Sequence, residues 1–269
     1  MTPEAIRQAA GLLADLRLRA AGRDAPLDEL PEDCRPSTLE EAYAIQDALR
    51  PLVAKGGFGP QAGWKIGCTT PVMQRYLDIP HPCAGTLYRA RLHRGRASLR
   101  ADGFFQLGLE CEIAVRLACD LGPRDGGHDA RSVASAVGGV MASVEIVEHR
   151  FVDFTQTSTP SLVADDFFSA GCALGEEREP GALGDLADLT GGFSLDGAPA
   201  AETGKGSAIL GHPLNALAWL ADHLGARGGG LEADQVVTLG SVVKTIYPTA
   251  GTTVEARFEG LPPVSLEIV

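Results

Sequence analysis

Residues 109 to 117 constrain this chain more than any other part of its sequence. Apolar side chains alternate there with Glu110, Glu112, Ala114 and Arg116. Strict alternation predicts a half-buried β-strand, because successive side chains of a strand point to opposite faces. Residues i and i+2 of a strand lie roughly 6.5–7 Å apart on one face, so the two carboxylates repel each other unless a cation pairs with them. The stretch therefore predicts a strand with a charged site on one face.

A third carboxylate, Glu145, stands in the middle of the apolar stretch 141–147. A glutamate in such a strand is costly without a partner. Three carboxylates suit a hard divalent ion such as Mg²⁺ or Mn²⁺, with Glu110, Glu112 and Glu145 as its ligands. In the alternative interpretation, Glu110 and Glu112 face solvent and pair with Arg116. The pattern alone leaves both interpretations open.

Three further sites are candidates for chemistry, each with a plainer alternative. Lys65 lies inside an apolar segment bounded by glycines, where it can serve as an acid or an anion clamp or extend to the surface. His149 follows the strand of Glu145 and is a candidate general base or a surface hydrogen-bonding residue. Asp165 and Asp166 precede two phenylalanines, and the pattern favours a structural loop cap or anchor over a chemical role.

Composition excludes several other classes of function. The chain has 269 residues, a formal net charge of −12, 45 % hydrophobic and 22 % charged residues, which predicts one large globular domain or two modest ones. No dense basic cluster is present, so nucleic acid is not expected as a partner. The longest uncharged run, 206–221, is too short to cross a bilayer. The charged N-terminus and the absence of C-x-x-C spacing among the cysteines indicate a cytoplasmic protein with reduced thiols.

Local signals predict a helical start followed by a strand-rich remainder. One helix begins at Pro3 and a second at the capping-box pattern 37–40. Strands are expected at 63–67, 109–117 and 140–147, with a short helix after Asp129 that ends at Gly138 and Gly139. A helix begins at Pro213 and stops at Gly225, and three strands follow at 235–243, 252–258 and 264–269. The prediction is an α+β chain with a helical part at 1–62 and a β-rich catalytic domain at 63–269.

Five segments in this order resemble the fumarylacetoacetate hydrolase superfamily, and within it the 2-keto-4-pentenoate hydratase / 4-oxalocrotonate decarboxylase branch. The segments are Gly63-Trp64-Lys65-Ile66-Gly67-Cys68-Thr69, Leu109-Glu110-Cys111-Glu112-Ile113-Ala114, Val144-Glu145-Ile146-Val147-Glu148-His149-Arg150, Val163-Ala164-Asp165-Asp166 and Gly211-His212-Pro213-Leu214-Asn215-Ala216-Leu217-Ala218-Trp219-Leu220. The strand that closes at Gly240 and Ser241 also fits. Together these segments run through nearly the whole chain.

The resemblance implies a mixed β-rich catalytic fold with a divalent ion, Mg²⁺ or Mn²⁺, on Glu110, Glu112 and Glu145. Lys65 falls on a lysine that lines the active site of the family. We expect the catalytic residues to be Lys65, Glu148 and His149. The residues expected to contact substrate are His81, Asp165, Phe168, Ser169 and Ser241.

The expected reaction is metal-dependent addition of water to a 2-hydroxy-2,4-dienoate of the 2-keto-4-pentenoate type, giving a 4-hydroxy-2-oxo acid in the meta-cleavage catabolism of aromatic compounds. Alternatives are a 4-oxalocrotonate-type decarboxylase, an acylpyruvate carbon–carbon hydrolase, or a non-catalytic partner subunit. The expected partners are a small 2-oxo acid, further copies of the chain in a homo-oligomer, and a decarboxylase of the pathway.

Three stretches depart from the family pattern. Residues 80–83 read Pro-His-Pro-Cys where many hydratases carry an acid. The pair Phe167 and Phe168 replaces smaller residues, and residues 242–244 read Val-Val-Lys where many relatives have a threonine. These differences lie near the expected position of the substrate tail, so they bear on substrate identity more than on the metal.

Overall fold

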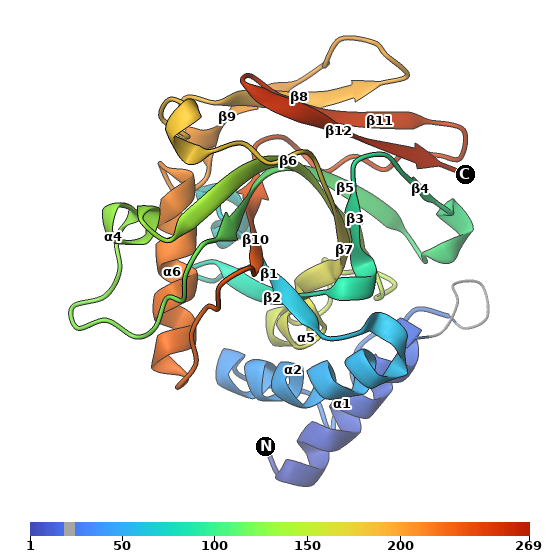
Figure 1. Cartoon of the computed structure of the whole chain (residues 1–269). Helices are drawn as coiled ribbons and strands as arrows, with labels where there is room; N and C mark the ends of the chain where they lie inside the picture. The colour runs from blue at the N-terminus through green and yellow to red at the C-terminus, as the bar shows by residue number, and fades with distance from the viewer. Residues whose placement is uncertain (19–24) are drawn as a thin grey trace.

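Two long antiparallel strands, β5 (Leu107–Leu117) and β6 (Val137–Glu148), form the centre of the structure. The other strands of their sheet are β1 (Gln61–Gly67), β2 (Cys83–Tyr88), β3 (Leu92–Arg94), β7 (Ser169–Leu174) and β10 (Val236–Ser241). The computed structural model describes residues 1–18 and 25–269. Its seven-stranded sheet has the order β2-β1-β10-β5-β6-β7-β3 and curls into a barrel-like ring (Figure 1). The ring brings β2 back to β7, where the Ser169 hydroxyl donates to the Thr86 carbonyl at 3.0 Å.

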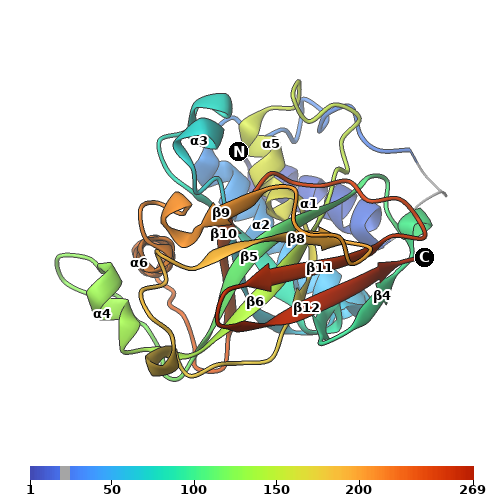
Figure 2. The same ribbon diagram turned by 90° about the horizontal axis from the view of Figure 1, so that it is seen from above.

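A second, five-stranded sheet covers β6 on the outside of the ring (Figures 1 and 2). Its strands are β4 (Ala97–Leu99), β8 (Thr190–Leu195), β9 (Thr203–Lys205), β11 (Thr253–Phe258) and β12 (Leu261–Ile268). They lie in the order β4-β12-β11-β8-β9. Because this sheet shields the outer face of β6 and the ring encloses the inner face, strands at the centre lose contact with water on both sides.

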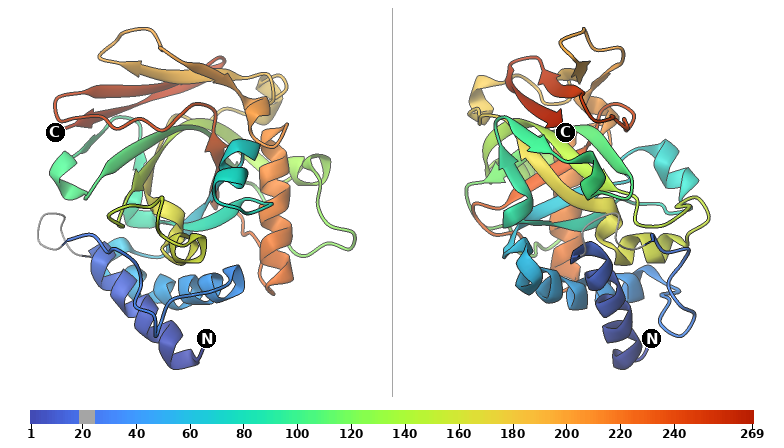
Figure 3. Two further views of the ribbon diagram at one scale, coloured as in Figure 1. Left: turned by 180° about the vertical axis from the view of Figure 1, so that it is seen from behind. Right: turned by 90° about the vertical axis from the view of Figure 1, so that its right-hand side faces the viewer.

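The helices pack against the ring from below and from one side (Figure 3). They are α1 (Pro3–Leu18), α2 (Leu39–Val53), α3 (Pro71–Tyr76), α4 (Ala130–Ala134), α5 (Thr159–Ala164) and α6 (Pro213–Ala226). A π-helical turn, Ala54–Phe58, follows α2, and 3-10 turns cover Arg89–Arg91, Ala101–Gly103, Asp166–Phe168, Pro180–Ala182 and Gly206–Ala208. Within the described residues, no helix is both long enough and apolar enough to pass through a membrane.

Most of the predicted elements are confirmed, and their caps explain why. The Thr38 side chain caps α2 by accepting from the Glu41 amide, one residue later than the pattern at 37–40 predicted. His212 caps α6 through its Nδ1, which accepts from the Leu214 amide at 3.0 Å. Asp129 caps α4 in a capping box with Ser132. Side chains of this kind satisfy the amides that a helix leaves unpaired at its first turn.

Four predictions of local structure need correction. The strand at 109–117 is not half-buried, because both of its faces lie inside the protein and only Glu110 and Arg116 reach intermediate exposure. Gly138 and Gly139 do not end a helix but lie within β6. Gly225 does not stop α6, which continues to Ala226. The strands β2, β7 and β8 were not predicted, since short segments buried on both faces lack a clear period. The helices α3 and α5 were not predicted either, because each is only six residues long, too short to show a helical period.

Residues from both sides of the predicted boundary at 62 share one hydrophobic core. Leu13 of α1, Ile45 of α2 and Leu109 of β5 are fully buried members of the same cluster. Arg17 of α1 is also buried and donates to the carbonyl groups of Asp165 and Ser169. The helical N-terminal part therefore supports the segment that leads into β7, beside the interior of the ring.

Candidate active site

The three predicted metal ligands meet inside the ring. Glu110 and Glu112 lie two residues apart on β5, and the antiparallel register sets Glu145 of β6 directly opposite Glu110. Each of the three offers a carboxylate oxygen, and these oxygens lie within 4.8 Å of one another. Glu112 and Glu145 are fully buried and Glu110 is half-buried. The solvent-facing alternative with Arg116 is wrong, because Arg116 pairs with Glu177 at 2.7 Å.

One oxygen of each carboxylate is fixed by a donor from β10 or from the segment after it. Thr238 Oγ1 donates to Glu145 at 3.3 Å, and the Gly240 amide donates to Glu112 at 3.0 Å. Thr245 Oγ1 donates to Glu110 at 2.6 Å. Such outer contacts orient ligating carboxylates and are a regular part of metal sites. They leave Glu112 Oε1 buried without any hydrogen-bond partner, which is the observation that a bound cation explains.

Lys65 provides the positive charge beside this cluster. It projects from β1 and is 1 % exposed, and its Nζ lies 2.8 Å from Glu145 Oε1 and 4.9 Å from the centre of the Phe167 ring. Burial lowers the pKa of Lys65, but the neighbouring Glu145, Glu110 and Glu112 outweigh burial, so the net pKa is raised. The ammonium group therefore stays charged at the wall of the site.

One lysine does not balance three glutamates. Burial first, and then Glu145 and Glu110, raise the pKa of Glu112 well above its ordinary value. Burial likewise raises the pKa of Glu145 in spite of Lys65. A divalent cation held by oxygen ligands removes this excess of negative charge, so the residues present fit a divalent metal ion.

A cavity of about 610 Å³ opens beside the carboxylates. Five of the predicted site residues line it: Lys65, Glu110, His149, Phe168 and Ser241. Glu112 and Glu145 are buried next to Glu110, in the inner wall. Concave sites of this size, largely apolar with a few polar groups at one end, are the usual form of small-molecule sites.

The structure places the other four predicted site residues outside the wall of this cavity. Glu148 accepts from the Phe105 amide at 3.0 Å and from Arg150 at 2.9 Å, so it is not free to activate water. His81 does not line the cavity, and its imidazole faces Trp219 of α6, with the two ring centres 6.2 Å apart. These two predictions of direct contact with water or substrate conflict with the geometry, because side-chain periodicity does not show which groups are already paired.

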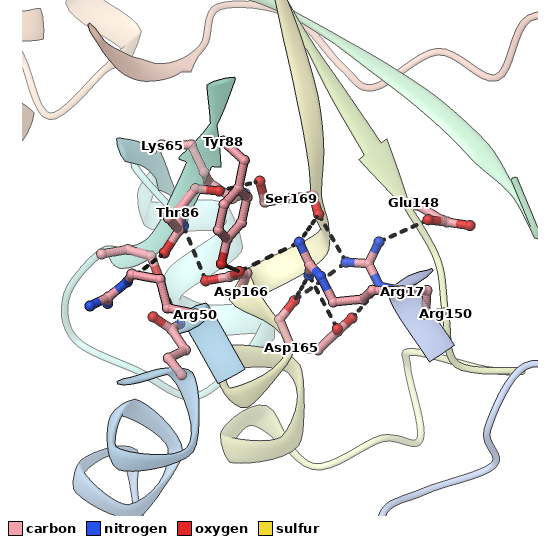
Figure 4. Close-up of polar contacts among 12 residues, drawn as sticks. Arg17, Arg50, Lys65, Thr86, Tyr88, Glu148, Arg150, Asp165, Asp166 and Ser169 are labelled. Atoms are coloured by element: carbon pink, nitrogen blue, oxygen red, sulfur yellow. Dashed lines mark hydrogen bonds and ion pairs between the residues drawn. The ribbon is translucent and has the colours of Figure 1, made fainter. Parts of the chain in front are cut away.

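Asp165 and Ser169 belong to a buried polar network (Figure 4) and do not line the cavity. Arg150 Nε lies 2.7 Å from Asp165 Oδ2, and Arg17 Nη1 lies 3.3 Å from Asp165 Oδ1. Both arginines also donate to the Ser169 carbonyl, at 3.1 and 2.9 Å. The geometry thus shows the structural role that the sequence favoured for the Asp165–Asp166 pair. It does not support direct substrate contact by Asp165 or Ser169.

His149 lies in an aromatic group on the cavity wall. Its Nε2 is 3.2 Å from the Tyr247 hydroxyl, and its ring is 4.6 Å from Phe154 and 5.1 Å from Phe168. Burial, and then the charge of Arg150, lower the pKa of His149 to about 4, although Glu148 acts in the opposite direction. The imidazole is therefore neutral near pH 7, and its unprotonated nitrogen can accept a hydrogen bond.

The low pKa of His149 predicts a loss of stability in acid. Between about pH 6.5 and 4 the unfolded chain binds a proton at this histidine and the folded chain does not, so the free energy of unfolding falls as the pH falls through this window. Urea unfolding at pH 7 and at pH 4.5 measures this loss. In His149→Gln the free energy of unfolding should fall less between the two pH values than in the unsubstituted protein. An equal fall would contradict the lowered pKa of His149 as the cause.

Sequence analysis missed several residues that hold the site together. No sequence pattern identifies Tyr247, Thr238 and Thr245 as site residues, since their hydrogen-bond partners are distant in sequence. Arg17 does carry a signal, because it lies four residues after Leu13 on the apolar face of α1, where an unpaired arginine is costly.

The chain is similar to characterised hydratases over nearly its whole length. It is 34 % identical to the 2-hydroxyhexa-2,4-dienoate hydratase of Comamonas testosteroni, across 93 % of this chain and 92 % of that relative. It is 32 % identical to a 2-keto-4-pentenoate hydratase of Burkholderia vietnamiensis, across 95 % of both. No model of a known protein family matches the sequence.

The fold is also that of a solved structure. The 4-oxalocrotonate decarboxylase from Pseudomonas putida G7, complexed with magnesium and adipate, superimposes with a TM-score of 0.91 at 24 % identity, across 100 % of this chain and 99 % of that one. These likenesses agree with the carboxylate cluster and with the predicted α+β class. The chain therefore belongs to the 2-keto-4-pentenoate hydratase family, the branch that its sequence motifs resemble.

Proposed function

We propose that this protein is a metal-dependent hydratase that adds water to a 2-hydroxy-2,4-dienoate and releases a 4-hydroxy-2-oxo acid, in the meta-cleavage catabolism of aromatic compounds. The observation that carries the proposal is the cluster of Glu110, Glu112 and Glu145 beside Lys65, at a cavity whose lining is largely apolar. The hydratase names of the relatives support it. Mg²⁺ or Mn²⁺ is the proposed ion, since both prefer oxygen ligands.

The bound ion supplies Lewis-acid polarisation of the 2-oxo acid. The residues of the chain do the rest. Lys65 Nζ steadies negative charge that develops on the substrate oxygen or delivers a proton there, since it is charged and buried at the cavity wall. Ser241 lines the same wall and offers a hydroxyl for the substrate. With His149 neutral and Nε2 unprotonated, the Tyr247 hydroxyl donates to Nε2, and the pair presents a hydrogen-bonding group on the cavity wall.

Metal dependence gives the first test of this proposal. Purified protein treated with EDTA should leave the ultraviolet absorbance of 2-hydroxypenta-2,4-dienoate unchanged beyond its spontaneous decay. Added Mg²⁺ or Mn²⁺ should restore a rapid loss of absorbance, with 4-hydroxy-2-oxopentanoate as the product. A rapid loss in EDTA would contradict the metal-dependent mechanism, and no loss with metal would contradict hydration of this substrate class.

Decarboxylation is the second candidate reaction, because the same cluster suits any 2-oxo acid. Its structural support is the likeness to the decarboxylase of P. putida G7, which at 24 % identity concerns the fold alone. Measuring carbon dioxide together with the hydration product separates the two reactions.

The assembly and the compartment of the protein stay predictions. We propose a homo-oligomer that can associate with a decarboxylase of the same pathway, and a cytoplasmic location. Light scattering on the purified protein, alone and mixed with that decarboxylase, tests both associations.

A further inference from the structure

A second cavity, of about 320 Å³, lies on the other face of β1. Lys65 lines the active-site cavity and its neighbour Trp64 lines the second cavity, because successive side chains of a strand point to opposite faces. Among the described residues, the two cavities have no lining residue in common. At roughly 30 Å³ for each non-hydrogen atom of a small molecule, the second cavity takes a ligand of about ten such atoms.

One face of α2 supplies much of the polar wall of the second cavity. Tyr43, Gln46, Asp47 and Arg50 all line it. They stand at positions i, i+3, i+4 and i+7, the spacing that places side chains on one face of a helix. The facing wall is the end of α6 with the residues after it, which include His223 and the range 227–230. The helix α2 therefore turns hydrogen-bonding groups toward the second cavity.

Two buried polar atoms of the wall lack partners. Gln46 is 1 % exposed and Trp64 is 7 % exposed. Neither Gln46 Oε1 nor Trp64 Nε1 has a hydrogen-bond partner within the part of the chain that the structure describes. The orientation of the Gln46 amide is fixed, since its Nε2 donates to the carbonyl groups of Ala84 and Val163. Burying a donor or an acceptor without a partner is costly, so these atoms indicate a ligand group that both donates and accepts, as a hydroxyl does.

Two partly exposed arginines of the wall share one aspartate. Arg50 Nη2 lies 3.1 Å from Asp47 Oδ1, and Arg227 Nη2 lies 2.6 Å from Asp47 Oδ2. Each guanidinium carbon also lies 5.0 Å from the centre of an aromatic ring, that of Trp64 for Arg50 and that of Tyr43 for Arg227, which favours a fixed position. One carboxylate neutralises one of the two guanidinium groups, so one positive charge remains for a ligand.

The other charged and titratable groups of the wall leave this balance unchanged. Burial first, and then Arg227 and His81, lower the pKa of His223 to about 4, although Asp47 acts in the opposite direction. His223 is therefore neutral near pH 7. The second acid among the described lining residues is Glu232, which is exposed, so water and salt screen its charge. The second cavity thus suits a ligand with a single negative charge.

We propose that the second cavity binds a small organic acid with one carboxylate and one hydroxyl group. The carboxylate pairs with Arg50 and Arg227, since planar guanidinium groups match carboxylate geometry. The hydroxyl accepts from Trp64 Nε1 and donates to Gln46 Oε1. The eight non-hydrogen atoms of 4-hydroxypentanoate fill about 240 Å³ at the same scale, so this acid is a suitable probe. The product of the proposed reaction also carries these two groups, but binding here does not depend on that reaction.

Titration calorimetry with 4-hydroxypentanoate gives the direct test, with EDTA present so that no metal ion binds the acid. One molecule should bind per chain. Pentanoate, which lacks the hydroxyl, should bind about tenfold more weakly, the scale of two hydrogen bonds. Pentane-1,4-diol, which lacks the carboxylate, should bind at least tenfold more weakly. No binding of 4-hydroxypentanoate, or equal affinity for the three compounds, would overturn the proposal.

Arg227→Gln tests the charge of the second cavity. It removes the positive charge that Asp47 leaves unbalanced and should weaken binding of 4-hydroxypentanoate at least tenfold. The matched control is Arg100→Gln, because Arg100 is an exposed arginine paired with Asp102 and lines neither cavity. It should bind the acid as the unsubstituted protein does. Binding that is lost in Lys65→Met and kept in Arg227→Gln would place the acid in the active-site cavity and overturn the proposal.

Arg50 is a less suitable position for this test, because its Nε also donates to Thr86 Oγ1 at 3.3 Å (Figure 4). The Thr86 amide in turn donates to Asp166 Oδ1 at 3.1 Å. A substitution of Arg50 would therefore disturb the turn beside Lys65 as well as the second cavity.

Trp64 provides a test of the hydroxyl contact. In Trp64→Phe the ring is kept and the N–H is lost, so the preference for 4-hydroxypentanoate over pentanoate should fall from about tenfold to threefold or less. The chain has two tryptophans, so Trp64 is the single indole in Trp219→Phe. Saturating 4-hydroxypentanoate should shift the fluorescence emission of this variant to longer wavelength, as the indole N–H gains an acceptor. An unchanged emission together with an unchanged preference in Trp64→Phe would overturn the proposal.

Discussion

Glu112→Gln should lower metal-dependent kcat/KM by about a thousandfold, the upper end of the cost of removing one preorganised polar group that stabilises a transition state. Glu112 is fully buried, with one oxygen fixed by the Gly240 amide and the other unpartnered. Glutamine has nearly the same shape and accepts the same amide hydrogen bond, but it carries no negative charge for the cation. The measurement is the dienoate assay together with the affinity for Mn²⁺ by titration calorimetry.

The same variant should change stability in opposite directions with and without metal. Without metal, three buried carboxylates share the charge of Lys65, so removing one negative charge should make the variant at least as stable as the unsubstituted protein. At a metal concentration a hundred times Kd, the unsubstituted protein should gain about 2.7 kcal/mol in its free energy of unfolding, and the variant should gain much less.

Glu267→Gln is the control for these experiments, because Glu267 is an exposed glutamate of β12 outside the cavity. It should keep the activity and the metal response of the unsubstituted protein. Retention of metal-dependent activity by Glu112→Gln, with unaltered Mn²⁺ affinity, would contradict the assignment of Glu112 as a ligand.

The chemical centre was predicted because the family resemblance chose among the alternatives that strand periodicity left open. Glu110 and Glu112 share a face at i and i+2, and Glu145 and Lys65 are charged residues inside apolar segments. Buried charges of this kind require partners, and the structure brings all four together. The sequence alone did not predict the antiparallel register that sets Glu110 opposite Glu145. The alternation of residues therefore left open the alternative that Glu110 and Glu112 face solvent.

The prediction of substrate contacts was weaker for a physical reason. Glu148, Asp165 and Ser169 are polar residues near the site, but each is already hydrogen-bonded to a partner from another element. Whether a polar side chain is free to meet substrate depends on contacts between distant segments, such as Arg17 with Asp165. Local patterns identify residues that need a partner and do not identify the partner.

The strand at 109–117 shows the same limit at the level of the fold. Alternation of apolar and polar residues predicts one wet face, yet Glu110 and Glu112 of β5 meet Glu145 inside the ring. Inside such a ring, polar groups serve a ligand instead of water. The alternation at 109–117, which we interpreted as a half-exposed strand, therefore indicated a buried functional site.

Arg17→Met should lower the free energy of unfolding by about 3–4 kcal/mol, the range for removing one partner of a buried ion pair. Arg17 is 6 % exposed, and besides Asp165 its guanidinium lies 3.4 Å from Asp166 Oδ2. Methionine keeps the apolar stem of the side chain but leaves these oxygens with fewer donors. Urea unfolding in the presence and absence of metal measures the loss.

The stability loss should come with a loss of activity, because Arg17 supports the segment that carries Phe167 and Phe168. A shift of that turn would move the rings beside Lys65, and small displacements at an active site cost up to about a hundredfold in rate. We expect kcat/KM to fall about tenfold at a temperature where the variant is still folded. Arg7→Met is the matched control, since Arg7 is an exposed arginine of the same helix and should change neither property. If Arg17→Met unfolded at the same urea concentration as Arg7→Met, Arg150 alone would hold the turn, and α1 would act on the site through apolar packing rather than through charge.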